Sequence, residues 1–246
     1  MLEQLASLGR FGLFLFRILG TITLTRGQFG DIVRQCYSVG ARSVPIVAVG
    51  GAFVGLVMSL QGYRTLETFG AGNALGTLLG LSLFRELGPV LAAILFCGRA
   101  GSAMAAELGL MKATDQIKAL SMMAIDPVGK VVAPRFIAGV ISVPLLTMVF
   151  CAFAILGGYV QSVIVLGIDG GYFWGSLRNS VDLWEDFGQC LVKASFFGFA
   201  CSLIATHVGY HAEPTIEGTS VATTRSVVHG SLMVLFLDFI LSATLY

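Results

Sequence analysis

FIAGVISVPLLTMVFCAFAILGGYVQSVIVLGI, residues 136–168, contains no Asp, Glu, Lys or Arg. A helix needs about 20 apolar residues to cross the hydrocarbon core of a bilayer, so this stretch exceeds one crossing. We expect the crossing to end at Gly157 and Gly158, with a short apolar segment after them. An uncharged run of this length predicts a membrane-spanning helix and thereby decides the fold class.

Four further charge-poor stretches accompany it, between Arg42 and Arg64 and over about 74–98, 187–206 and 226–246. The whole chain is 56% hydrophobic and only 12% charged, with a mean hydropathy of +0.86. Soluble domains carry about 25% charged residues, and half of that leaves too little polar surface for a water-soluble globule. The prediction is an all-α membrane protein with one domain over residues 1–246 and five transmembrane helices over about 43–246.

The N-terminal segment has a different pattern. Glu3, Arg10 and Arg17 recur every seven residues and therefore share one helical face, opposite a leucine-rich side. Arg10 and Arg17 interrupt the apolar run too often for an easy crossing. We expect an amphipathic helix over about 1–30 that lies in the membrane interface.

Lysine and arginine are distributed unevenly between the two sides of the predicted bundle. The N-terminal segment and the connection 99–135 are basic, whereas the connection 169–186 is mostly acidic. By the positive-inside rule, the N-terminus is cytoplasmic and the C-terminus lies outside. Apolar residues at near-helical spacing also predict a cytoplasmic helix over about 104–125, with Gly109 and Asp126-Pro127 as local breaks.

Four charged residues fall inside the predicted spans: Arg85, Glu86, Lys193 and Asp238. A charge at the bilayer centre costs at least about 2.5 to 3.5 kcal/mol, so such residues normally face a bundle interior or a water-filled cavity. At 1.5 Å per residue they lie about 9 to 16 Å below the outer ends of their helices, which suggests an outward-facing polar cavity. Alternatively, Lys193 and Asp238 form an intramembrane pair that only fastens two helices. Arg85 and Glu86 are about 100° apart on a helix, so one of them can face the cavity and the other a neighbouring helix.

The chain lacks the sequence motifs of the common enzyme classes. It contains no GxxxxGK[ST] loop for ATP and no HExxH, GxSxG or Cys/His metal cluster. We therefore expect no catalytic residue, no cofactor and no metal, and the net charge of +1 implies no nucleic-acid partner. The five cysteines are interpreted as small apolar packing residues. His207 and His211 are four residues apart and could share a metal, but interfacial histidines are the commoner explanation.

A set of separated motifs resembles one permease family. The longest is GRAGSAMAAELGLM (98–111), continuing through TDQIKAL (114–120) and MAIDP (123–127) to APR (133–135). Shorter motifs lie on both sides of it: LQGY (60–63) and FRELGP (84–89) before, and TRSVVH (224–229) and LDF (237–239) after. Together they resemble the MlaE family of permeases, which belong to ABC systems that handle phospholipids alongside MCE-domain proteins.

The resemblance implies a function and a set of partners. Such a permease is a homodimer in the bacterial inner membrane, bound to ABC ATPase subunits that often carry a STAS-domain accessory subunit. It moves phospholipids between the inner membrane and a periplasmic MCE-protein pathway and so maintains outer-membrane lipid asymmetry. The cytoplasmic helix becomes a coupling helix, with Glu107, Met111, Asp115 and Lys118 as candidate ATPase contacts. Gln61 and Tyr63 are interface anchors by composition alone, and the resemblance adds them to Arg85 and Glu86 as candidate lipid-binding residues.

Two other classes of function are weighed against this one. In an ion-driven secondary transporter, Glu86 and Asp238 would carry protons, but no inverted repeat is recognisable and the cytoplasmic helix would have no purpose. A passive assembly platform would not need the costly intramembrane charges. Transport direction and headgroup preference stay open.

Overall fold

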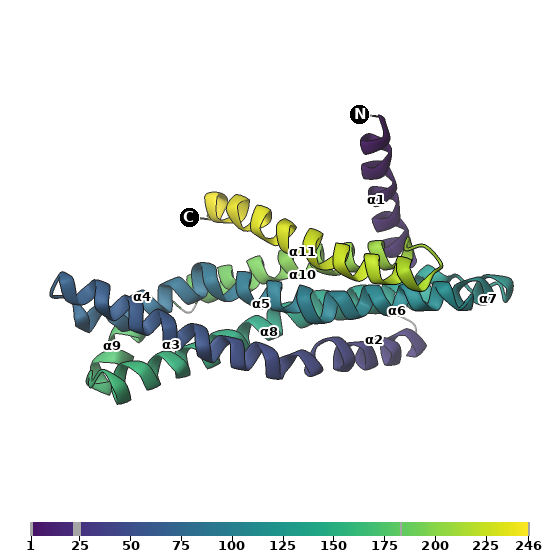
Figure 1. Cartoon of the computed structure of the whole chain (residues 1–246). Helices are drawn as coiled ribbons and strands as arrows, with labels where there is room; N and C mark the ends of the chain where they lie inside the picture. The colour runs from purple at the N-terminus through teal and green to yellow at the C-terminus, as the bar shows by residue number, and fades with distance from the viewer. Residues whose placement is uncertain (1, 22–25, 183, 246) are drawn as a thin grey trace. The chain divides into compact units, whose positions relative to one another are not determined.

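All regular structure in the described residues is helical (Figure 1). The computed structural model describes residues 2–21, 26–182 and 184–245. The α-helices are α1 (Leu2–Thr21), α2 (Arg26–Val39), α3 (Val44–Thr68), α4 (Leu75–Ser82), α5 (Gly88–Phe96), α6 (Ser102–Ala113), α7 (Gln116–Met122), α8 (Ala133–Tyr159), α9 (Gly170–Ser180), α10 (Glu185–Tyr210) and α11 (Ile216–Leu245). Short 3-10 helices lie between them at η1 (Ala41–Ser43) and η2 (Gly72–Ala74).

π-helical turns join α4 to α5 and α5 to α6, and they extend α8 at both of its ends. They are η3 (Leu83–Leu87), η4 (Cys97–Gly101), η5 (Val128–Val132) and η6 (Val160–Val165). Each such turn accommodates an extra residue and changes the direction in which its side chains point. The helical run from Leu75 to Ala113 is continuous for this reason.

Five helical runs among the described residues are long and apolar enough to cross a membrane. They are Phe29–Thr68, Leu75–Ala113, Val128–Val165, Glu185–Tyr210 and Ile216–Thr244, and a shorter apolar helix covers Phe11–Thr21. The predicted all-α membrane class with five spans is confirmed. The predicted break at Gly109 is wrong, because α6 continues through it. Helix α8 ends at Tyr159, directly after the predicted end at Gly157 and Gly158, and the short apolar segment η6 follows it. Helix α9 had no counterpart in the sequence-based prediction.

Contacts divide the chain into two compact units. Unit 1 comprises residues 1–42, 96–142 and 198–234, and unit 2 comprises residues 43–95, 143–197 and 235–246. Helices α8, α10 and α11 contribute residues to both. The single domain expected over residues 1–246 stays a prediction.

Unit 2 is held together by very close helix packing. A Cβ on Gly51 of α3 would lie 2.6 Å from the carbonyl oxygen of Phe150 in α8, and one on Gly55 would overlap that of Ala154. From the other side, a Cβ on Gly157 would overlap the carbonyl oxygen of Ala52. Small residues allow such backbone contact, which is how membrane helices gain packing without a hydrophobic driving force.

Helix α9 packs on α4 within the same unit. The hydroxyl of Thr77 lies 2.7 Å from that of Ser180 and donates to the carbonyl of Ser176 at 3.3 Å. The side chain of Asp169 accepts a hydrogen bond from the amide of Gly171 and so caps the start of α9.

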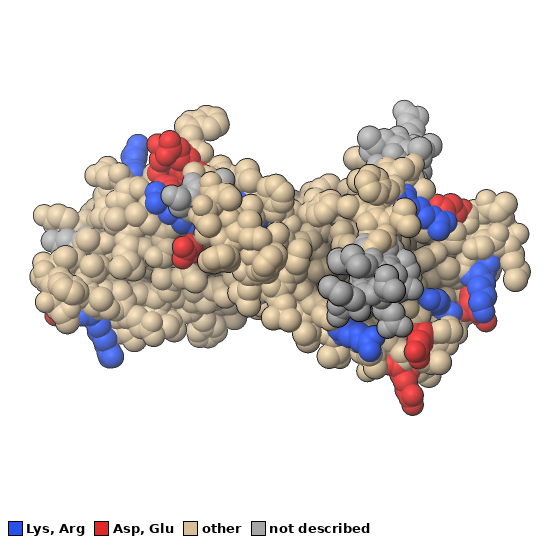
Figure 2. Space-filling model, turned by 90° about the horizontal axis from the view of Figure 1, so that it is seen from above, with Lys and Arg blue, Asp and Glu red and all other residues tan. Residues whose placement is uncertain are grey.

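Unit 1 has an apolar core that includes the N-terminal helix. Phe14 and Ile18 of α1 are buried against η5, α6 and α10, in contact with residues such as Leu108, Val132 and Leu203. Another face of α1 exposes Leu13 and Phe16, as membrane contact requires. The side chains of Glu3 and Arg10, which the amphipathic pattern used, lie outside the described part of the chain. Figure 2 shows the charged residues in small clusters on a surface that is mostly uncharged.

Candidate functional site

A proline removes one helical hydrogen bond at the turn that carries Arg85. Pro89 has no amide hydrogen, so it cannot donate to the carbonyl of the residue four positions earlier, which is Arg85. Leu83–Leu87 adopts a π-helical turn at this point, closed by a hydrogen bond from the amide of Gly88 to the carbonyl of Leu83. The Arg85 carbonyl is thereby available to a side chain from another helix.

Lys193 of α10 takes that position. Its Nζ donates to the carbonyl of Arg85 and to the hydroxyl of Ser242, at 2.8 Å in both cases. The same Nζ lies 3.6 Å from Oδ1 of Asp238, and the lysine side chain is fully buried. Asp238 and Ser242 are one turn apart on α11, so both face Lys193. A buried ammonium group with several oxygen partners is the arrangement that keeps its charge tolerable.

The guanidinium of Arg85 is held by a second contact from α10. Its Nε donates to Oδ1 of Asp186 at 2.7 Å, and the other oxygen of Asp186 accepts from the amide of Asp182 at 2.9 Å. The carboxylate of Asp186 is 3% exposed, whereas 43% of the Arg85 side chain is exposed. Asp186 therefore positions a guanidinium that still reaches the surface of the chain.

We call Arg85, Asp186, Lys193, Asp238 and Ser242 the polar cluster of unit 2. Sequence analysis named three of them and overlooked Asp186 and Ser242. The signal for Asp186 was its spacing, because it lies seven residues before Lys193 and two helical turns place both on one face of α10.

The remaining candidate lipid-binding residues lie differently. Glu86 is exposed beside the polar cluster. Gln61 is exposed near the end of α3, and the ring of Tyr63 lies against Gly72 of η2. Arg85 thus lies inside an ordered cluster, whereas Gln61 is placed as an interface residue would be.

An open groove of about 560 Å³ borders the turn that carries Arg85. Phe84, Leu177 and Phe187 form part of its apolar wall, and Arg178 and Asp182 supply charges. The rings of Phe84 and Phe187 pack edge to face with centroids 6.2 Å apart. Most of the lining comes from α9 and the residues after it, which sequence analysis had read as a plain connection.

The four candidate coupling residues separate into two groups. Glu107 and Met111 lie on α6, where Arg135 of α8 contacts both, at 3.1 Å from a Glu107 oxygen and 3.9 Å from the Met111 sulfur. Glu107 stays about half exposed in this contact, whereas the Arg135 side chain is largely buried. Asp115 and Lys118 form an exposed ion pair of 2.8 Å. The helix expected over 104–125 is therefore two helices, α6 and α7, separated at Asp115, whose φ of 56° interrupts the helical backbone.

Helix α7 and the residues after it present apolar side chains to the outside. Met122 is 86% exposed, Met123 61% and Ile125 42%. Methionine is flexible and polarisable, and exposed methionines are typical of surfaces that bind another protein. Sequence analysis quoted Met123 and Ile125 as part of the motif at 123–127, but it did not name Met122 or expect a protein-binding surface here.

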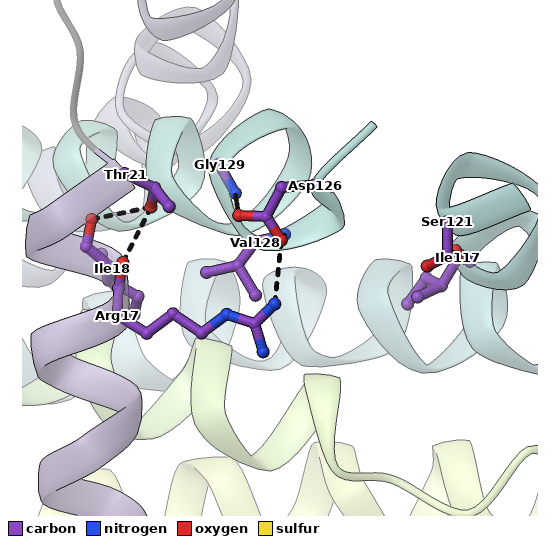
Figure 3. Close-up of polar contacts among 8 residues, drawn as sticks. All are labelled: Arg17, Ile18, Thr21, Ile117, Ser121, Asp126, Val128 and Gly129. Carbon is purple, nitrogen blue, oxygen red and sulfur yellow. Dashed lines mark hydrogen bonds and ion pairs between the residues drawn. The ribbon is translucent and has the colours of Figure 1, made fainter. Parts of the chain in front are cut away.

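Asp126 fixes the end of this segment (Figure 3). Its two carboxylate oxygens accept from the amides of Val128 and Gly129, at 3.4 and 3.2 Å, at the start of η5. The same carboxylate pairs with Arg17 of α1 at 3.0 Å. A single side chain thus begins the helical run that continues into α8 and joins it to the N-terminal helix.

The two histidines considered as metal ligands form part of an aromatic cluster. The rings of His207 and His211 stack with centroids 4.3 Å apart, and Phe14 packs against both. Among the described residues, no group of three His, Cys, Asp or Glu side chains could hold a metal ion. The pair is placed as structural histidines would be, and both residues also line a pocket.

Comparison with known proteins decides the family. The family model described as Permease MlaE matches residues 32–244. This chain belongs to the MlaE permease family.

Relatives of this MlaE permease come from distant sources. It is 48% identical to the intermembrane phospholipid transport system permease protein MlaE of Haemophilus influenzae, over all of this chain and 94% of that protein. It is 35% identical to a probable ABC transporter permease protein of Rickettsia typhi, over 98% and 92% of the two chains. It is also 29% identical to the chloroplastic protein trigalactosyldiacylglycerol 1 of Arabidopsis thaliana, over 87% and 61%.

Membership in the MlaE family decides between the classes of function weighed above. The chain is a permease of an ABC-type transport system and not an enzyme, and an ATPase partner is implied. The ion-driven carrier finds no support among these relatives.

Proposed function

We propose that this permease moves phospholipids and that the polar cluster of unit 2 receives their headgroups. The identity of 48% over the whole chain to a phospholipid transport permease carries the proposal. The cluster supports it chemically, because the partly exposed guanidinium of Arg85 suits a phosphate. The groove beside Phe84 offers apolar walls for acyl chains.

Reconstitution of the whole complex tests this function. In proteoliposomes, ATP should drive transfer of labelled phospholipid, and a proton or sodium gradient should not replace ATP. Arg85→Gln should lower transfer about tenfold or more, since a hydrogen bond to a charged group contributes about 1.5 to 3 kcal/mol. Arg64→Gln, exposed on α3 and outside the lining of the groove, serves as the matched comparison. Unchanged ATP-dependent transfer by Arg85→Gln would remove the cluster from the pathway.

The ATPase, in this proposal, docks on α7. Asp115 and Lys118 are exposed there beside Met122 and Met123, whereas Glu107 and Met111 are engaged by Arg135. The strongly exposed methionines favour the tip formed by α7 and residues 123–125 over α6 as the proposed contact.

Replacing Met122 tests this surface. Met122→Asp places a charge in an apolar contact and should reduce co-purification of the ATPase at least about tenfold. Met122→Leu keeps the apolar volume and should retain it. Co-purification is measured from membranes that contain equal amounts of each variant. If Met122→Asp retains the ATPase while Glu107→Lys loses it, α6 carries the contact instead.

We propose that the protein lies in the bacterial inner membrane with α7 in the cytoplasm, the N-terminus inside and the C-terminus periplasmic. The asymmetry of Lys and Arg supports this orientation. In a Cys36→Ser background, a cysteine at the exposed position 179 of α9 should react with an impermeant thiol reagent in intact cells. A cysteine at position 121 of α7 should react only after permeabilisation. The opposite pattern would invert the topology.

The proposed assembly is a homodimer with its ATPases, a STAS-domain subunit and an MCE-domain protein on the periplasmic side. Support comes from the family resemblance and from the name of the Haemophilus relative, which assigns it to an intermembrane phospholipid transport system. The mass of the intact complex in native mass spectrometry should equal two copies of this chain with those partners. A mass with one copy would exclude the homodimer.

A further inference from the structure

A second pocket lies in unit 1, where a short loop joins α10 to α11. It has a volume of about 480 Å³, and all three histidines of the chain line it. Glu213, Glu217 and Arg225 also line it. This pocket shares no residue with the polar cluster of unit 2.

The charges of this pocket are of both signs and are not neutralised by one another. In the described part of the chain, Arg225, Glu213 and Glu217 form no ion pair. The Nε2 atom of His207 is buried and has no hydrogen-bond partner among the described residues. A buried polar atom without a partner costs free energy, so the histidine side of the pocket is not fully satisfied by the described residues. The pocket thus offers donors for an anion and carboxylates for a cation.

The position along the helix corresponds to the headgroup layer of a membrane. The apolar run of α11 that can cross a membrane has 29 residues, which at 1.5 Å per residue measures about 44 Å. The hydrocarbon core is only about 30 Å thick, so the ends of this run reach the headgroup region. The pocket lies at the first of these ends.

An apolar stripe continues from the pocket along the same side of α11. Val221 lines the pocket, and Val228 and Leu232 follow at seven and eleven residues, which is helical spacing for one face. Val228 is 49% exposed and Leu232 60%. A lipid whose headgroup enters the pocket can therefore lay its acyl chains on this stripe.

We propose that this pocket binds a phospholipid with a zwitterionic, amine-bearing headgroup. Arg225 and the exposed His229 would contact the phosphate, and Glu213 and Glu217 would contact the ammonium group. The site does not depend on the transport proposal, because it lies in the other unit and requires neither ATP nor movement of lipid.

Lipid retention by the purified complex tests the site without ATP. The complex is equilibrated with equal amounts of phosphatidylethanolamine, phosphatidylglycerol and phosphatidylcholine, and bound lipids are counted by native mass spectrometry. Two variants alter the pocket: Arg225→Gln and the double variant Glu213→Gln with Glu217→Gln. The lipid bound at the pocket is taken as the amount that the wild-type complex retains and these variants lose. Thr224→Ala is the matched control, because Thr224 is exposed on α11 next to Arg225 and does not line the pocket.

We expect the wild type and Thr224→Ala to retain phosphatidylethanolamine about tenfold better than phosphatidylglycerol at this site. Arg225→Gln should lower retention of both about tenfold, as loss of a charged hydrogen bond predicts. The double glutamine variant should still retain phosphatidylglycerol and should lose the preference for phosphatidylethanolamine.

Two results would overturn the proposal: retention of both lipids by Arg225→Gln at the wild-type level, or an unchanged preference for phosphatidylethanolamine in the double variant. Soluble glycerophosphoethanolamine has no acyl chains for the apolar stripe. If it displaced bound phosphatidylethanolamine as well as added phosphatidylethanolamine does, the lipid assignment would be overturned.

Discussion

Gly55→Ala is expected to prevent unit 2 from packing, although it adds only one methyl group. The new Cβ would overlap the carbonyl oxygen of Ala154, which belongs to the backbone of α8 and cannot rotate away. Helices α3 and α8 would have to separate, which would also open the contacts at Gly51 and Gly157. Overpacking typically costs about 1 to 3 kcal/mol, and a clash with backbone belongs at or above the upper end. The melting temperature of the purified protein measures this loss.

Gly188→Ala is the matched control for that experiment. Gly188 also lies in a long apolar helix, α10, but a Cβ there meets nothing within 4 Å. Alanine is favoured over glycine within a helix by about 1 kcal/mol, so this variant should melt at or above the wild-type temperature. Equal melting temperatures for Gly55→Ala and Gly188→Ala would show that α3 and α8 can separate at little cost.

Lys193→Met is expected to have a comparably large effect. It leaves the carboxylate of Asp238 without its nearest cation and the Arg85 carbonyl without its donor. Breaking a buried ion pair from one side typically costs about 3 to 5 kcal/mol. Asp238→Leu should cost less, because the carboxylate is 24% exposed and Lys193 keeps two other hydrogen-bond partners.

The double variant Lys193→Met, Asp238→Leu separates the ion pair from the rest of the cluster. It should recover part of the stability that Lys193→Met loses, since no lone charge is left. Recovery should be incomplete, because the hydrogen bond from Lys193 to the Arg85 carbonyl is still lost. Ser195→Ala on the exposed side of α10 is the control. Strictly additive losses in the thermal melts would show that Lys193 and Asp238 do not interact. Recovered stability without recovered lipid transfer would show that the pair also serves transport.

The class of fold was predictable because the bilayer restricts which sequences can cross it. Long runs without charge identified all five spans, and intramembrane charges identified Arg85, Lys193 and Asp238 as worth attention. Glycine misled the prediction of helix ends. Gly109 was taken as a break, but it lies inside α6 at a point where the side chain of Thr219 comes close.

The rest depended on tertiary contacts that periodicity does not contain. Asp186 resembled an ordinary acidic residue near the start of a helix until the structure placed Arg85 against it. Glu107 and Met111 had suitable chemistry for docking, but Arg135 engages both. The interruption at Asp115, between α6 and α7, requires a left-handed backbone conformation that sequence spacing does not indicate.

Backbone contact between α3 and α8 limits how the outer spans can move. Helices that meet through long side chains can slide, because rotamers adjust as the helices shift. Where Gly51 and Gly55 touch main-chain oxygens of Phe150 and Ala154, no rotamer is available to adjust. Helix α3 and residues 143–158 should therefore move as one rigid body during a transport cycle. Within unit 2, the freedom to rearrange then belongs to the α10 and α11 segments, whose contacts run through the flexible side chain of Lys193.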